Sequence, residues 1–283
     1  MKVILLSLLL LVNVYAKSFF SNDTQADNSK YIGALKDLVI STQKTRGLTN
    51  TYLNGDTVAL LLVQKNKQDM KEAIGKMEAS NLSADPVINT RATAISQALV
   101  KLNRKALKMK PAKAFESYTE QIDQVLMLAQ TVSRRNSKDL NPLGQEASSM
   151  MMEIILPMTE YIGRMRGKGA GLAAKAAVSA EQNLQVLSMI SEIEDLQKQL
   201  QAKMQSLLAK YPDSFNTTIN TMMGSIDNTT KAYVKLTKTV LLRTPDKVNA
   251  TDYFDQGTDL ITLLIKLYDD NNRAILKDSE GWI

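Results

Sequence analysis

Apolar positions recur every three or four residues along most of the chain, which is the spacing of amphipathic helices. The clearest example lies between residues 184 and 207, where the apolar positions share one face and charged residues take the others. The apolar residues are Leu184, Leu187, Ile190, Ile193, Leu196, Leu200, Met204 and Leu207. This pattern predicts one long helix that buries a single face.

Turn and capping residues divide the chain into eight predicted helices. They cover about residues 24–53, 57–79, 85–110, 111–137, 141–177, 179–211, 213–244 and 249–279. Asp85 followed by Pro86 is a typical helix start, and Ser179 with Gln182 forms a capping box. Asn249 or Thr251 is expected to cap the last helix. Pro157 lies inside the fifth helix and predicts a kink there, because proline has no backbone N–H to donate.

Helices this long, joined by short turns, pack as antiparallel bundles, so the predicted fold class is all-α. Eight helices would form two stacked four-helix bundles or one elongated stack. We expect sub-bundles at about residues 24–138 and 141–280, within one helical unit at 17–283. The low content of Gly (12) and Pro (6) and the 5% aromatic content favour helices over sheets.

The composition excludes several classes of chemistry. The chain has no Cys and no His, which removes thiol and imidazole catalysis and the usual zinc ligands. Adjacent acid pairs such as Asp269 and Asp270 do not converge on one helix face. We therefore expect no enzyme activity, no cofactor and no metal site. Nucleic acid is not an expected partner, because basic residues do not alternate with aromatic ones.

Residues 1–16 have the pattern of a signal peptide. Lys2 precedes an apolar stretch from Val3 to Val12, and Val14 and Ala16 fit the small-residue positions before a cleavage site. Cleavage near Ala16 would lower the formal charge of +6 by one and leave a periplasmic or secreted protein. The alternatives are a buried N-terminal helix or an uncleaved anchor.

Two Arg-Gly pairs occur in the middle of predicted helices, at Arg46-Gly47 and Arg166-Gly167. The second pair lies in a run that also contains Gly163, Gly169 and Gly171, although each glycine costs a helix about 1 kcal/mol relative to alanine. Close helix packing is one explanation for these glycines. The other is a site that leaves room for a ligand, because the guanidinium fork of arginine matches planar anions.

The chain resembles the nitrate- and nitrite-sensing (NIT) domain family over roughly residues 30–280. Residues 43–47 with 52–53 are similar to its first-helix motif, although Thr45 stands where members often carry Glu or Arg. Residues 115–122, 163–167 and 253–259 are similar to later segments of the family.

The resemblance implies an all-helical sensor that binds a small anion, such as nitrate or nitrite, near arginines. The ligand-binding candidates are Arg46, Arg164 and Arg166, and the helix-packing candidates are Gly47, Gly163 and Gly167. Family members usually continue into a membrane helix and an output domain. We therefore expect a membrane receptor or histidine kinase as the signalling partner, and a homodimer.

Two alternatives stay open at this point. Arg46 and Arg166 would form salt bridges with acids inside the bundle, such as Glu153 or Glu160, instead of binding a ligand. Separately, the whole protein could be a non-sensory helical adaptor or structural protein of the cell envelope instead of a sensor.

Overall fold

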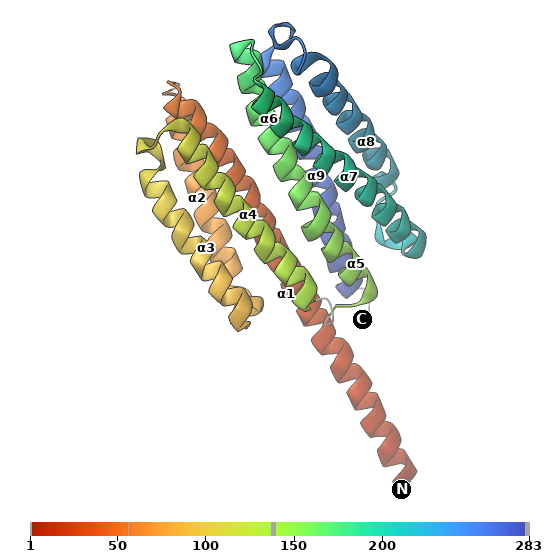
Figure 1. Cartoon of the computed structure of the whole chain (residues 1–283). Helices are drawn as coiled ribbons and strands as arrows, with labels where there is room; N and C mark the ends of the chain where they lie inside the picture. The colour runs from red at the N-terminus through yellow and green to blue at the C-terminus, as the bar shows by residue number, and fades with distance from the viewer. Residues whose placement is uncertain (1, 56, 137–139, 281–283) are drawn as a thin grey trace.

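The computed structural model describes the backbone of residues 2–55, 57–136 and 140–280, and the side chains of residues 25–55, 57–135 and 140–277. Every regular element in the described residues is helical, which confirms the predicted all-α class. Figure 1 shows two groups of long helices that lie side by side.

The first group contains α1 (Lys2–Leu53), α2 (Ala59–Glu78), α3 (Pro86–Lys105) and α4 (Pro111–Asn136). Helix α1 packs along α2 and α4, and α3 packs on α4. Short 3₁₀ turns at Asn81–Ala84 and Ala106–Lys108 join the helices.

The second group contains α5 (Pro142–Met150), α6 (Leu156–Lys175), α7 (Ala180–Lys210), α8 (Ile219–Leu236) and α9 (Ala250–Glu280). Helix α6 packs on α7 and α9, and α8 packs on α9. Two π-helical segments, Met151–Ile155 and Thr237–Leu241, follow α5 and α8.

The two groups share one continuous hydrophobic core. Helix α1 contacts α9 and α6, and α4 contacts α5 and the first π-helical segment. Leu35 of α1, Ile155 of that segment and Leu264 of α9 are all fully buried members of the same cluster. In Figure 1, α2 and α3 lie on the outer side of the first group, and α7 and α8 on the outer side of the second. Helices α1 and α6 therefore meet inside the molecule.

The predicted helix starts are found where the capping residues place them. The Asp85 carboxylate accepts from the backbone N–H groups of Val87 and Ile88. Ser179 and Gln182 form the complete capping box. At the last helix, Asn249 Oδ1 accepts from the N–H groups that begin α9, so Asn249 and not Thr251 is the cap.

Helix α1 and the predicted fifth helix differ from expectation. Helix α1 begins at Lys2 instead of near Thr24 and has no break before Leu53. The fifth helix is divided into α5 and α6 by the π-helical segment, in which the N–H of Leu156 donates to the carbonyl of Met151 five residues earlier. The irregular segment therefore ends just before Pro157, the residue at which the sequence predicts a kink.

The buried stripe of α7 also differs at its start. Leu184 is 69% exposed and Leu187 is 40% exposed, whereas Val186 is fully buried. Val186 lies four residues before the buried Ile190, so it takes the core position in this first part of the helix. The next helix, α8, begins at Ile219 instead of Asp213, because a 3₁₀ turn at Pro212–Ser214 follows the end of α7.

The predicted signal segment, residues 1–16, lies outside the residues whose side chains are described. Within the part of the chain whose side chains are described, no helix has a segment that is long and apolar enough to cross a membrane.

Candidate functional site

Arg46 of α1 lies inside the protein, with a side chain that is only 2% exposed. Its Nη1 donates to Thr119 Oγ1 of α4 at 2.8 Å, and its guanidinium carbon lies 4.7 Å from the ring centre of Phe115. On the α6 side the backbone comes close at Gly163, where an added Cβ would lie 3.4 Å from Nη2 of Arg46. Three helices therefore enclose this guanidinium.

Glu160 of α6 neutralises Arg46. Arg46 Nη1 donates to Glu160 Oε1 at 2.5 Å and Nη2 donates to Oε2 at 3.1 Å, so the two forks face each other. Glu160 is also 2% exposed, and it accepts two more bonds, from Gln43 Nε2 at 3.0 Å and from Arg164 Nε at 2.6 Å. Of the two acids considered from the sequence, the bridging one is Glu160. Glu153 instead accepts from the hydroxyl of Ser133 at 3.0 Å.

Arg164 links this buried pair to the edge of α4. It bonds both Glu160 and Asp123, and its side chain is 22% exposed. Burial alone would lower the pKa of Arg164, but the two carboxylates outweigh burial and raise it. Its guanidinium carbon lies 5.8 Å from the ring centre of Tyr161. Arg164 is therefore paired with acids on two helices.

Arg166 points toward α9 and has a different environment. Its Nη1 donates to Thr258 Oγ1 at 2.8 Å, and its guanidinium carbon lies 4.3 Å from the ring centre of Phe254. Its Nε is buried without an acceptor, and no carboxylate of the described residues forms a salt bridge with it. Burial is the main cause that lowers the pKa of Arg166; the positive charge of Arg46 also lowers it, whereas Tyr233 and the charge of Glu160 act in the opposite direction. Arg166 is thus a partly buried cation with an unused donor.

A buried hydroxyl lies beside Arg166. It is the hydroxyl of Tyr233, which has the Tyr253 hydroxyl as a neighbour, and the backbone of Gly257 packs between it and Arg166. An added Cβ at Gly257 would lie 2.7 Å from that hydroxyl and 3.0 Å from Arg166 Cβ. The Tyr233 ring is tilted against Tyr253 at 4.8 Å between centroids, and the Tyr253 hydroxyl is paired with that of Thr237 at 2.9 Å.

Arg164 and Arg166 thus lie on two different faces of α6. Glu160, Arg164 and Gly167 face α1 and α4, and Arg166 faces α9. Gly163 lies between the two faces, because an added Cβ there would contact both Arg46 of α1 and Ile261 of α9. The cluster holds three arginines and two bonded carboxylates, which leaves one positive charge.

The predicted packing glycines are not equivalent. An added Cβ at Gly163 would contact Arg46, and one at Gly167 would lie 3.5 Å from the Phe115 ring. At Gly47 an added Cβ would have nothing within 4 Å, so this glycine is not required for a close helix approach. Among the described residues, the packing role predicted for Gly47 therefore has no close contact to support it.

Sequence reasoning missed Asp123 and Tyr233. Neither was named as a site candidate, and each reaches the site only through tertiary packing, 41 residues from Arg164 and 67 residues from Arg166. Phe115, Thr119, Phe254 and Thr258 were singled out only as members of motif segments, and their contacts with the arginines come from the structure.

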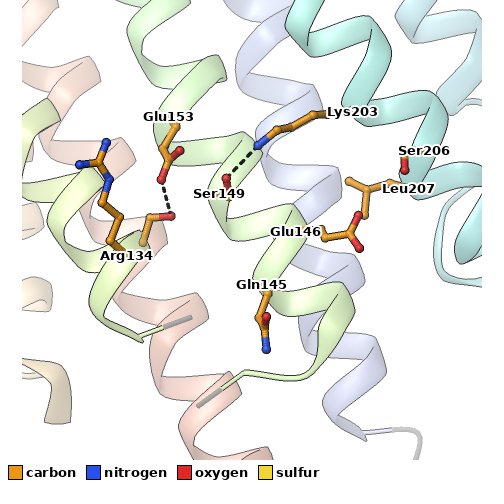
Figure 2. A pocket seen from close by; sticks show the side chains of 9 residues that line it. Arg134, Gln145, Glu146, Ser149, Glu153, Lys203, Ser206 and Leu207 are labelled. Carbon is orange, nitrogen blue, oxygen red and sulfur yellow. Dashed lines mark hydrogen bonds between the residues drawn. The ribbon is translucent and has the colours of Figure 1, made fainter. Parts of the chain in front are cut away.

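A separate pocket of about 360 Å³ lies between α4, α5 with its π-helical extension, and α7 (Figure 2). Its lining mixes charges of both signs, and none of the predicted arginines takes part in it. Glu153, Lys203 and Ser149 point into it, and Lys203 Nζ donates to Ser149 Oγ at 3.0 Å. No group of three or more acids that could hold a metal ion occurs among the described residues.

Comparison with known proteins identifies the family. The sequence profile described as nitrate and nitrite sensing matches residues 37–275, which is more than half of the chain. No curated protein matches the chain. The solved structure of the NasR transcription antiterminator superimposes with a TM-score of 0.65, covering 98% of this chain and 75% of that one at 15% identity. That likeness shows a shared fold, and the profile match shows that this chain belongs to the nitrate- and nitrite-sensing family.

Proposed function

We propose that this chain senses a small monovalent anion of the nitrate or nitrite kind, bound at the arginine cluster of α1 and α6. In this proposal the anion contacts Arg166 and the fork of Arg46, and Arg164 contributes to the site through its bonds to Glu160 and Asp123. The sensor acts outside the cytoplasm, through a separate membrane partner such as a receptor or a histidine kinase.

The observation that carries the proposal is the state of Arg166. A partly buried guanidinium with no carboxylate partner is costly unless an anion compensates it. Nε of Arg166 has no acceptor, and the buried hydroxyl of Tyr233 lies beside the same arginine across Gly257. Arginine and hydroxyl donors of this kind match the oxygen atoms of a planar oxoanion.

The charge balance favours a monovalent ligand. The three arginines exceed the two bonded carboxylates by one charge. One nitrate or nitrite ion would neutralise the cluster, whereas sulfate would leave a buried negative charge. Burying an unbalanced charge is unfavourable, so we expect sulfate to bind much more weakly.

The compartment and the partner rest on the N-terminal pattern. Residues 1–16 have the charge and apolar length of an export signal. A sensor outside the cytoplasm needs a membrane protein to carry its signal inward.

Calorimetric titration with sodium nitrate and sodium nitrite, at ionic strength fixed with sodium gluconate, tests the binding proposal. In thermal denaturation, we expect nitrate at 100 times its Kd to raise the free energy of unfolding by about 2.7 kcal/mol and to raise Tm accordingly. Arg166→Gln should abolish the binding heat. Arg135→Gln is the matched control, because Arg135 is an exposed arginine on α4 that pairs with Asp85. Full binding by Arg166→Gln, or none by the wild type, would overturn the proposal.

Cell fractionation tests the compartment. The chain would be expressed with its native N-terminus in a bacterium, and the mature N-terminus read by mass spectrometry. We expect it in the periplasmic fraction, starting at Lys17. A cytoplasmic product that retains Lys2 would contradict export.

A helical adaptor of the cell envelope is the second candidate, and one observation favours it. Leu61 and Leu62, neighbours near the start of α2, are 77% and 48% exposed and together form an apolar surface at this end of the helix. Serine at both positions should release a bound envelope protein if they form a docking face. Unchanged nitrate binding by the same variant would separate this role from sensing.

A further inference from the structure

We propose that Glu160 is an internal competitor for the anion, holding the guanidinium of Arg46 until the ligand displaces it. The inference rests on the proposed function, since it names the residue that opposes ligand binding at the same site. It assigns to one carboxylate a role in setting affinity.

The geometry of the pair is that of a bound oxoanion. Glu160 presents its two oxygens to both terminal nitrogens of Arg46, at 2.5 and 3.1 Å. A nitrate or nitrite ion on Arg46 would use the same two nitrogens, because side-by-side contact with the fork is the favoured geometry for planar anions. The ligand and Glu160 therefore cannot both hold the whole fork.

Glu160 has enough other donors to release Arg46. Gln43 donates to its Oε2 and Arg164 donates to its Oε1, so the carboxylate would keep one charge partner and one amide after the exchange. Arg164 is held in place from the other side by Asp123. The exchange therefore leaves no buried carboxylate without a partner.

Arg46 also keeps its position without Glu160. Its guanidinium lies over Phe115, and its Nη1 donates to Thr119, both on α4. These contacts fix the fork while its acidic partner changes. The released pair joins α1 to α6, so the exchange removes a direct bond between the two groups of helices. Ligand binding would thus change a contact between the two halves of the molecule.

Removing the competing charge should strengthen binding. We expect Glu160→Gln to bind nitrate about tenfold more tightly than the wild type, because the ion then displaces a neutral amide instead of a carboxylate. Glu153→Gln is the matched control: it removes a half-buried carboxylate two helical turns earlier, where the partner is Ser133. Its affinity should equal that of the wild type.

The sign of the change decides the role. If Glu160 only positions Arg46, Glu160→Gln should bind nitrate more weakly, and that result would overturn the proposal, as would unchanged affinity. Arg166→Gln distinguishes this failure from that of the proposed function. If the wild type binds nitrate and Arg166→Gln does not, the proposed sensor function is supported. This holds even if Glu160→Gln binds nitrate no more tightly than the wild type.

A structural measurement covers the case in which Glu160→Gln does not fold. The wild-type protein would be crystallised with and without saturating sodium nitrate. We expect the ion on Arg46, with the Arg46–Glu160 salt bridge broken and the Arg164–Glu160 salt bridge intact. An unbroken Arg46–Glu160 pair in the nitrate-bound protein would refute the competition.

Discussion

Gly169 of α6 lies directly against the ring of Tyr253 of α9. A Cβ added at position 169 would overlap Cε1 of that ring, closer than two carbon atoms can approach. The ring of Tyr253 is tilted against that of Tyr233, and its hydroxyl is hydrogen-bonded to that of Thr237. The position of Tyr253 therefore affects that of Tyr233, which lies beside Arg166. The close packing of α6 on α9 therefore depends on a residue without a side chain.

Alanine at this glycine should destabilise the protein. Gly169→Ala forces the fully buried Tyr253 ring to move, and we expect a loss of about 2 kcal/mol in the free energy of unfolding. Gly171→Ala is the control, because an added Cβ there would have nothing within 4 Å. It should stabilise the protein by up to about 1 kcal/mol through helix propensity. Urea denaturation measures both, and equal effects would contradict the packing argument.

The helical fold could be predicted from local signals. Asp85 and the Ser179–Gln182 box act within one turn of the chain, and the structure confirms them as helix starts. The π-helical segment before Pro157 could not be predicted, because it depends on which hydrogen-bond register the surrounding packing favours. Leu184 was assigned to the wrong face because periodicity does not show which of two nearby apolar residues meets a neighbour.

The candidate site was predictable only in part. Arg46 and Arg166 could be singled out as unusual arginines beside mid-helix glycines. The sequence could not show that Arg46 is paired with an acid and Arg166 is not. Glu160 lies only six residues before Arg166 on the same helix, but it faces Arg46 of α1, whereas Arg166 faces α9. Which arginine is paired depends on the arrangement of α1 and α9 around α6.

The Arg46–Glu160 pair should show strong energetic coupling. Arg46→Met leaves a buried carboxylate with fewer partners, and Glu160→Gln leaves a buried guanidinium, so each should cost about 3–5 kcal/mol. The double variant should cost less than the sum by about 2 kcal/mol, because neither charge is then left alone. Urea denaturation of the four proteins in gluconate gives the coupling energy, and additive losses would mean that the pair contributes no net interaction.

Stability should fall steeply at alkaline pH, and Tyr118 should account for part of the loss. Burial raises the pKa of Tyr118 to about 12, and its hydroxyl donates to Asn103 Oδ1 at 2.8 Å. The unfolded chain loses this proton near pH 10, so between about pH 10 and 12 the folded state binds more protons than the unfolded state. Stability therefore decreases in this window by about 1.4 kcal/mol per pH unit for this group.

Tyr118→Phe tests that assignment. The variant has no proton to lose at this position, so its free energy of unfolding should fall less steeply between pH 10 and 12 than that of the wild type. Its value at pH 7 should be lower by about 1 kcal/mol, because the bond to Asn103 is gone. Parallel pH profiles for the two proteins would show that the Tyr118 hydroxyl does not titrate in this range.

Arg166→Lys separates the charge of the arginine from its shape. Lysine keeps the positive charge of the cluster, but it has no planar fork and cannot present two parallel donors to an oxoanion. We expect the variant to bind nitrate at least about tenfold more weakly than the wild type, a loss of roughly 1.4 kcal/mol. Its preference for nitrate over sulfate should remain, because that preference follows from the single excess charge. Wild-type affinity in Arg166→Lys would show that net charge alone holds the anion, and a gain of sulfate binding would show that charge balance does not set the selectivity.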